Sequence, residues 1–150
     1  MDFASLGTIL GVWAHPDDEA YLSAALMAQA VRAGSRVMCV TATRGEAGSQ
    51  DELRWPPEKM AEIREAELMA TLRVLGVTEH RWLDYIDGTC AEVDEDEATA
   101  KVAAIFDEVQ PDSVLCFGPD CQTGHPDHIA THRWTTRAFH ERAKSGAKLY

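Results

Sequence analysis

The chain has 150 residues, of which 45% are hydrophobic and 26% are charged, and this composition is typical of one globular domain with a buried core. It excludes a disordered or fibrous protein. Because 25 acidic side chains outnumber 14 Lys and Arg, the formal net charge is -11. We therefore expect neither nucleic acid nor an anionic membrane surface as a partner.

The apolar runs are no longer than a strand, and the N-terminal segment lacks the basic stretch of a signal peptide. We expect a cytoplasmic protein without stable membrane insertion. The cysteines form no C-x-x-C pair, so buried free thiols are expected rather than disulfides or a thiolate zinc site: Cys39, Cys90, Cys116 and Cys121. A homo-oligomer is compatible with the sequence, which leaves the oligomeric state open.

In chain order, the first half predicts a strand, a helix, a strand, a loop, a helix and a strand: residues 8–14, 18–33, 36–41, 43–57, 58–75 and 81–85. The first two strands are short, continuous apolar runs, which is typical of strands covered on both faces. The two helices carry apolar residues at helical spacing and end at Gly34 and Gly76. The last strand precedes an Asp87-Gly88 turn.

The second half predicts a helix, a strand, a polar turn, a helix and the opening of another strand: residues 95–109, 113–117, 118–128, about 129–142 and 147–150. The acidic run VDEDE is interpreted as a solvated helix start favoured by the helix dipole, not as a calcium site. Strands that alternate with helices predict an α/β fold with an open, mostly parallel sheet. Because a strand opens at the last residues, we expect a chain truncated at its C-terminus.

Two polar turns follow two of the buried strands along the chain, AHPDDE at residues 14–19 and TGHPDH at residues 123–128. In open α/β sheets, ligands bind beyond the carboxyl ends of the strands. His15 and Asp18 are three residues apart, as are His125 and His128, and this spacing at a helix start can aim two side chains at one point. Imidazole and carboxylate groups are normal zinc ligands, and three protein ligands with a water are typical of a catalytic site. The turns predict an open, hydrolytic metal site.

The remaining side chains of these turns suit acid–base chemistry. Asp17 is a spare carboxylate that can act as the general base, because a metal lowers the pKa of its bound water toward ~7. Of His125 and His128, one can bind the metal while the other stabilises the oxyanion or protonates the leaving amine. The alternative is that Asp17 or Asp18 simply caps the helix. The repetition of His-Pro-Asp after two buried strands favours the metal site.

Other motifs are interpreted structurally. TRGEAG, at residues 43–48, lacks the lysine and glycine spacing of a Walker loop, so we expect a loop that borders the metal site. Three histidines are expected on the surface or in the core, and three tryptophans are expected to pack in the core rather than against a sugar. These residues are His80, His132, His140, Trp55, Trp82 and Trp134.

AHPDDE followed by HPDH, with TRGE and an Arg-Glu-x-Glu helix (Arg64, Glu65, Glu67) between them, resembles the LmbE-like or PIG-L family of zinc-dependent de-N-acetylases. The resemblance covers nearly the whole chain. It implies a Rossmann-like sheet with helices on both faces, and a hydrolase that removes the acetyl group from an N-acetylglucosamine-type sugar conjugate. Because relatives are longer, residues 1–150 would be the N-terminal two-thirds of a single deacetylase domain.

Carried over by position, the resemblance assigns a role to eight residues. It implies that zinc is bound by His15, Asp18 and His128, and that Asp17 is the general base. It also implies that His125 is the catalytic histidine with Asp127 as its orienting partner, and that Arg64 and Asp87 lie on the substrate side. Some relatives have a tyrosine two residues before the catalytic histidine. Thr123 occupies that position here, so the oxyanion donor is left open.

The leading function is deacetylation of a small N-acetylated amino-sugar conjugate, with the metal-bound water activated by Asp17. The metal is left open between Zn²⁺ and Fe²⁺. One alternative is an amidase that acts on a thiol-sugar S-conjugate, and another is a non-catalytic metal- or carbohydrate-binding module with an incomplete pocket.

Overall fold

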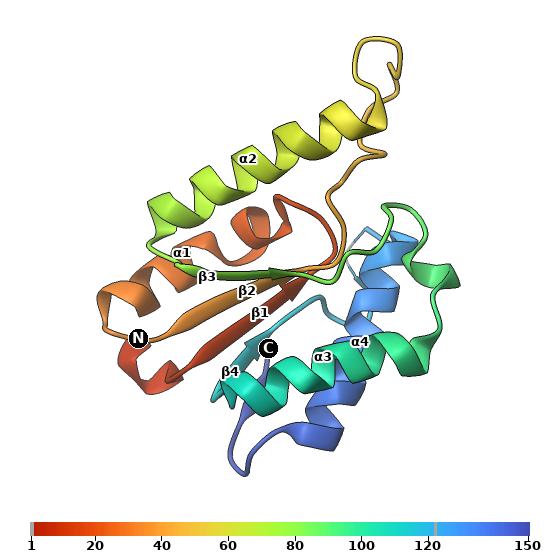
Figure 1. Ribbon diagram of the computed structural model, residues 1–150. Coiled ribbons are helices and arrows are strands. Elements are labelled where there is room, and N and C mark those ends of the chain that lie inside the picture. Colours follow the sequence, from red (N-terminus) through yellow and green to blue (C-terminus); the bar gives the residue numbers. More distant parts are fainter. Residues whose placement is uncertain (1, 122) are drawn as a thin grey trace.

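The computed structural model describes residues 2–121 and 123–150 as a five-stranded parallel sheet between two pairs of helices (Figure 1). The strands are β1 Ile9–Trp13, β2 Val37–Thr41, β3 Glu79–Trp82, β4 Ser113–Leu115 and β5 Lys148–Leu149, in the order β3-β2-β1-β4-β5. The helices are α1 Asp18–Arg32, α2 Pro57–Leu75, α3 Glu95–Val109 and α4 Pro126–Arg142, with short 3-10 helices at Phe3–Leu6 and Cys90–Glu92. The predicted Rossmann-like α/β fold is confirmed.

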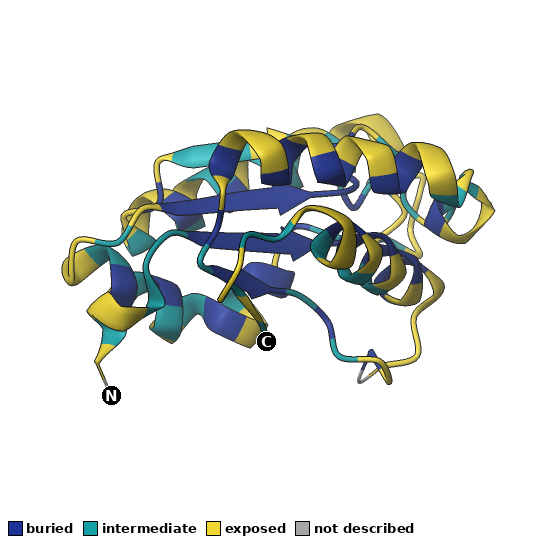
Figure 2. Cartoon of the chain, turned by 90° about the horizontal axis from the view of Figure 1, so that it is seen from below, coloured by how far each residue is buried: buried dark blue, intermediate teal, exposed yellow. Residues whose placement is uncertain are grey.

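Alternate side chains of the central strands pack against the two helix layers. In β1, Leu10 and Val12 belong to the core shared with α3 and α4, whereas Ile9 and Trp13 belong to the core shared with α1 and α2. Every residue of β1 and β2 is buried, as the dark strands of Figure 2 show. The apolar runs are continuous because both faces of the sheet are covered.

The start of α3 and the end of α2 carry residues that are typical of helix caps. The Asp94 carboxylate accepts the N–H of Glu97 at 2.9 Å and so caps α3. This cap and the acidic first turn of α3 confirm that the VDEDE run is a helix start. At the end of α2, Gly76 has a φ of 80°, in the left-handed region that favours glycine.

Two strands differ from their predicted bounds by more than one residue at an end. β3 covers Glu79–Trp82 rather than residues 81–85, because its ladder with β2 starts at Glu79. Leu83 and Tyr85, which suggested a later strand, lie beyond the ladder and pack against the core. β4 ends at Leu115 rather than at residue 117, where its pairing with β1 also ends.

Within the described residues, the four cysteines are free thiols, three of them buried and Cys116 half-buried. Burial raises the pKa of the Cys116 thiol to about 12. Among these same residues, no helix combines the length and the apolar character needed to span a membrane.

The two neighbouring strands β1 and β4 lead to helices on opposite faces of the sheet. These strands are neighbours, yet β1 leads into α1 on one face of the sheet and β4 leads into α4 on the other (Figure 1). The chain therefore diverges at the carboxyl edge between them, where open α/β sheets bind ligands. Both His-Pro-Asp turns lie at this point.

Candidate metal centre and active site

The turns after β1 and β4 bring three histidine rings together. Nδ1 of His15 lies 3.2 Å from Nε2 of His128. The ring centre of His125 lies 4.9 Å from that of His15 and 5.1 Å from that of His128. His125 is the N-cap residue of α4, and Pro126 suits the first helical position because it needs no N–H there. Two turns that are distant in the sequence thus form one cluster.

Asp18 completes a set of three donors. One of its carboxylate oxygens lies 3.6 Å from Nδ1 of His15, and the other lies 3.4 Å from Nε2 of His128. Ligand atoms around a tetrahedral zinc ion lie roughly 3.3–3.6 Å from one another. The two imidazole nitrogens lie close to this spacing, whereas Asp18 meets each histidine with a different oxygen, so the three groups fit zinc by their chemistry. The same donor set also suits Fe²⁺.

Two groups of three potential ligands share His15, and neither includes Asp18. One combines it with His125 and His128, and the other combines it with Asp87 and Asp127, with all ligand atoms of a group within 4.8 Å. The two carboxylates, however, lie 3.0 and 3.2 Å from Nε2, the outer ring nitrogen of His15. Such contacts orient a metal-binding imidazole and leave its other nitrogen available. We therefore favour Nδ1 of His15, with Asp18 and His128, as the metal-binding set.

Asp127 has a different partner from the expected one. It is fully buried, and its carboxylate accepts the N–H groups of Gly88 at 2.7 Å and Cys90 at 3.1 Å in addition to contacting His15. It meets His125 through its backbone N–H, which donates to Nδ1 at 3.2 Å. The first turn of α4 directs the Asp127 carboxylate inward to His15, so the predicted orienting role toward His125 would act through the backbone N–H, and it stays a prediction.

Charges at the centre are strongly coupled. Burial alone would lower the pKa of His15, but hydrogen bonds to Asp127, Asp18 and Asp87 raise it to about 11. Burial would raise the pKa of Asp87 and Asp127, but the contact with His15 holds both below their ordinary value. Burial also lowers the pKa of His128. A metal bound at Nδ1 of His15 would therefore displace a proton.

Asp17 lies beside the three donors with an unusual backbone. Its φ is 105°, in the left-handed region that non-glycine residues rarely adopt. Its carboxylate makes no capping hydrogen bond to α1, and Oδ2 lies 2.8 Å from Nη2 of Arg64 instead. The Asp18 carboxylate accepts the N–H of His15 at 2.8 Å. The capping alternative is therefore not supported for Asp17.

A cavity of about 310 Å³ opens over these groups. Seven of the eight predicted site residues line it, together with Gly45, Ala47, Gly48 and Gly88, and the eighth, Asp127, is buried beneath it. The glycine and alanine residues of TRGEAG form part of the wall, so the interpretation of this motif as a loop that borders the site is confirmed.

Asp87 lies deeper than expected for a residue on the substrate side. Its side chain is 8% exposed, with one oxygen against His15. The other oxygen accepts the N–H of Ala47 at 2.9 Å. Asp87 therefore links the loop after β2 to a predicted metal ligand, although it also lines the cavity.

Sequence reasoning assigned no role to two residues of this centre, Thr123 and Glu19. The hydroxyl of Thr123 lies 3.1 Å from Nδ1 of His128, the nitrogen that faces away from the other donors. Glu19 is 1% exposed, and its Oε2 accepts the N–H of Asp17 at 3.0 Å. Burial raises the pKa of Glu19 to about 7. Both adjoin the motifs, but their spacing alone does not distinguish these contacts from an ordinary turn or helix start.

The histidines and tryptophans that were interpreted structurally in the sequence lie outside the lining of this cavity. Trp134 is buried and Trp82 packs against the core, as expected, whereas Trp55 is half-buried beneath the ammonium group of Lys59. His80 contacts the hydroxyl of Thr41 at 3.0 Å, and Nδ1 of His132 lies 2.7 Å from the carbonyl oxygen of Phe117. His140 lies in the last turn of α4.

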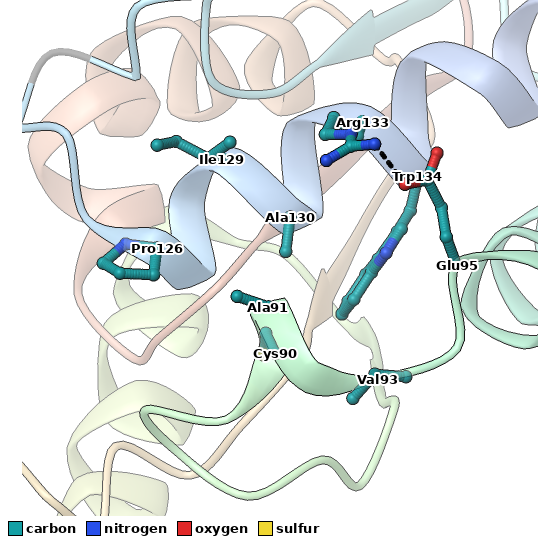
Figure 3. A pocket seen from close by; sticks show the side chains of 9 residues that line it. All are labelled: Cys90, Ala91, Val93, Glu95, Pro126, Ile129, Ala130, Arg133 and Trp134. Atoms are coloured by element: carbon teal, nitrogen blue, oxygen red, sulfur yellow. Dashed lines mark ion pairs between the residues drawn. The ribbon is translucent and has the colours of Figure 1, made fainter.

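A second cavity, of about 200 Å³, lies between α4 and the 3-10 helix Cys90–Glu92 (Figure 3). Val93, Ile129 and Trp134 make its wall largely apolar, and Arg133 and Glu95 form an ion pair of 2.7 Å beside it. Its lining residues do not offer a cluster of metal donors. The candidate site is therefore the cavity over His15 and His128.

A family model described as PIG-L, GlcNAc-PI de-N-acetylase, matches residues 10–139. The chain belongs to the PIG-L family. It is 34% identical over 168 aligned residues to the 1D-myo-inositol 2-acetamido-2-deoxy-alpha-D-glucopyranoside deacetylase of Kineococcus radiotolerans, covering 93% of this chain and 46% of that protein. The chain spans about half the length of the curated relatives it matches.

Solved structures agree with the family fold. The N,N'-diacetylchitobiose deacetylase from Pyrococcus horikoshii superposes with a TM-score of 0.82 at 25% identity, covering 99% of this chain and 61% of that one. GalB from Pseudomonas putida, a 4-carboxy-2-hydroxymuconate hydratase, has a TM-score of 0.79 at 23% identity, covering 95% of this chain and 61% of that one. Since deacetylases and a hydratase share the fold, the reaction must be argued from the site.

Proposed function

We propose that the protein is a zinc-dependent hydrolase that removes the acetyl group from an N-acetylglucosamine-type sugar conjugate, with residues 1–150 as the N-terminal two-thirds of a single deacetylase domain. The observation that carries the proposal is the Asp17 carboxylate, which makes no capping bond and lies in one cavity with three converging metal donors. Deacetylation of 2-acetamido-2-deoxy sugars is what the names of the curated relatives describe. A small N-acetylated amino-sugar conjugate is therefore the proposed substrate.

In this proposal, His15, Asp18 and His128 hold the metal. Bound zinc would supply a Lewis acid that polarises the amide carbonyl and acidifies a water molecule. Asp17 accepts the proton of the attacking water, because its carboxylate lines the same cavity and is not used as a donor to the metal. The hydroxyl group ends on the acetyl carbon as acetate, and the proton ends on the released amine.

His125 is the proposed catalytic partner of Asp17 and lines the same cavity. Its ring lies beside those of His15 and His128, and it is placed at the start of α4 rather than within the favoured donor set. Protonated His125 would stabilise the oxyanion and give a proton to the leaving amine. Arg64 and Asp87 line the cavity and are the proposed contacts of the sugar, although each also binds a residue of the centre.

The Asp17→Asn variant tests the proposal. Acetate release from a panel of N-acetylated amino sugars should fall by about 10²–10⁴ in kcat, the range for loss of a general base. Zinc content, measured by metal analysis, should not change. Asp107→Asn, an exposed substitution on α3, serves as the matched control and should leave both quantities unchanged.

Unchanged acetate release from zinc-loaded Asp17→Asn would overturn the role of Asp17. Faster cleavage of a thiol-sugar S-conjugate than of every N-acetyl sugar in the panel would instead identify an amidase. Stoichiometric metal binding without turnover of any substrate would identify a non-catalytic module.

A further inference from the structure

The peptide group between Pro16 and Asp17 is held on both sides by side chains. Its N–H, which belongs to Asp17, donates to Oε2 of Glu19 at 3.0 Å. Its carbonyl oxygen, which belongs to Pro16, accepts a hydrogen bond from Nη2 of Arg64. The same Nη2 lies 2.8 Å from the carboxylate of Asp17. Two side chains therefore fix the plane of this peptide, and one of them also holds the acidic group that follows it.

The backbone of Asp17 needs such support. A φ of 105° is strained for a residue with a Cβ atom, and strained conformations persist only where the surroundings over-determine them. Rotation of the Pro16–Asp17 peptide would relieve the strain and would move the Asp17 carboxylate away from its present position. The contacts of Glu19 and Arg64 both oppose that rotation.

Glu19 is placed in a way that packing alone does not explain. It is 1% exposed, although burial of a carboxylate costs free energy unless its oxygens are hydrogen bonded. Oε2 accepts the N–H of Asp17, while Oε1 has no hydrogen-bond partner among the described residues. Glu19 is absent from the lining of the cavity. Any effect of Glu19 on the reaction is therefore exerted through Asp17.

Arg64 reaches the peptide because two residues of the neighbouring loop are glycines. A Cβ atom at Gly45 would lie 3.0 Å from Nε of Arg64, and one at Gly48 would lie 3.1 Å from Nη1. The guanidinium therefore lies against two glycines of the TRGEAG motif. This gives the motif a physical role that its sequence did not reveal, because it makes room for the side chain that holds Asp17.

We propose that Glu19 and Arg64 are positioning residues that hold the Pro16–Asp17 peptide, and through it the carboxylate of Asp17, in the orientation required to accept a proton. The inference rests on the proposed function for the role of Asp17. It adds Glu19 to the residues that the reaction depends on, and it gives Arg64 a role besides contact with the substrate.

The test compares two substitutions of Glu19. Glu19→Met keeps the length of the side chain without an oxygen acceptor, whereas Glu19→Gln keeps an oxygen that can accept the N–H of Asp17. We expect at least a tenfold loss of kcat in Glu19→Met with KM and zinc content unchanged, and recovery of most of kcat in Glu19→Gln. Ser23→Ala, one turn further along the buried face of α1, is the control and should leave kcat unchanged.

A crystal structure of Glu19→Met provides a readout that does not depend on activity. We expect Asp17 to adopt a negative φ and its carboxylate to leave Arg64. An unchanged kcat in Glu19→Met, or a φ that stays near 105° together with a lower melting temperature only, would overturn the inference. If the wild-type protein releases no acetate from any substrate, the proposed function fails, while the crystal structure still tests the positioning of Asp17.

Arg64→Lys keeps the inference testable if Glu19→Met does not fold. A lysine ammonium cannot reproduce the planar fork of the guanidinium. We expect kcat to fall whether or not KM also rises, and Arg73→Lys in the last turn of the same helix to change neither. A rise in KM with kcat unchanged would show that Arg64 acts only on the substrate and would overturn its positioning role.

Discussion

Nε2 of His15 lies 3.0 Å from Oδ1 of Asp87, while Nδ1 of the same ring faces Asp18 and His128. One imidazole thus joins the candidate metal centre to the loop that contains Asp87. Because the contact on the outer nitrogen sets the orientation of the ring, it also sets the direction of the nitrogen available to the metal.

We predict that Asp87→Asn weakens zinc binding by about 10–100-fold, the usual effect of removing a carboxylate that orients a metal-binding histidine. Competition with a chromogenic chelator measures the affinity. The control is Asp84→Asn, which removes an exposed carboxylate three residues earlier. A rise in KM with unchanged zinc affinity would instead show that Asp87 contacts only the substrate.

Removal of a single metal ligand should weaken binding strongly, since a site with three protein ligands keeps only two of them. We expect His15→Ala, Asp18→Ala and His128→Ala each to lose zinc on dialysis and to lose activity in parallel. His140→Ala, at the far end of α4, should retain both. Stoichiometric zinc in all three ligand variants would contradict the assignment.

Alanine substitutions at two glycines with positive φ distinguish the effect of backbone strain from the effect of contact with Arg64. Gly45 has a φ of 68° and faces Arg64, whereas Gly34 has a φ of 90° and a Cβ atom there would meet nothing within 4 Å. Alanine at either site should cost about 1–2 kcal/mol and lower Tm by roughly 2–8 °C. Only Gly45→Ala should also reduce kcat. Equal activity in the two variants would contradict a role for the Gly45–Arg64 contact.

His80 should make the fold sensitive to mild acid. Burial lowers its pKa from 6.5 to about 4. Between these values the unfolded chain binds a proton that the folded chain does not, so stability is lost as the pH falls from 6.5 toward 4. The loss is on the order of 1–3 kcal/mol. Urea denaturation across this range should show a smaller loss in His80→Gln, and identical pH profiles would contradict the prediction.

Much of the fold could be predicted because local signals agreed with the tertiary arrangement. α3 matches its predicted bounds, Glu95–Val109, since an acidic cap precedes it and Pro111 follows it. β3 could not be placed as well. It lies at the edge of the sheet, where Glu79 and Arg81 need not be apolar. The strand was therefore predicted too far along the chain, at the apolar residues that follow it.

Part of the candidate site could likewise be predicted from the sequence, and part could not. Donors in the two His-Pro-Asp turns could be predicted to converge, because the carboxyl ends of neighbouring parallel strands meet at one edge. The partner of the Asp127 carboxylate could not, because it depends on the direction of one side chain relative to the loop at residues 88–90. The positive φ of Asp17 likewise arises from contacts with residues outside its own turn.

His15 and His128 are separated by 113 positions in the sequence, yet their ring nitrogens face each other at 3.2 Å. Closure of so long a loop carries a large entropic cost, so this pair forms only together with the contacts between β1, β4 and α4. A chain in which α4 has not docked has no complete donor set. Metal affinity is thereby coupled to global folding, and added zinc should raise Tm in proportion to the logarithm of its concentration once the sites are saturated.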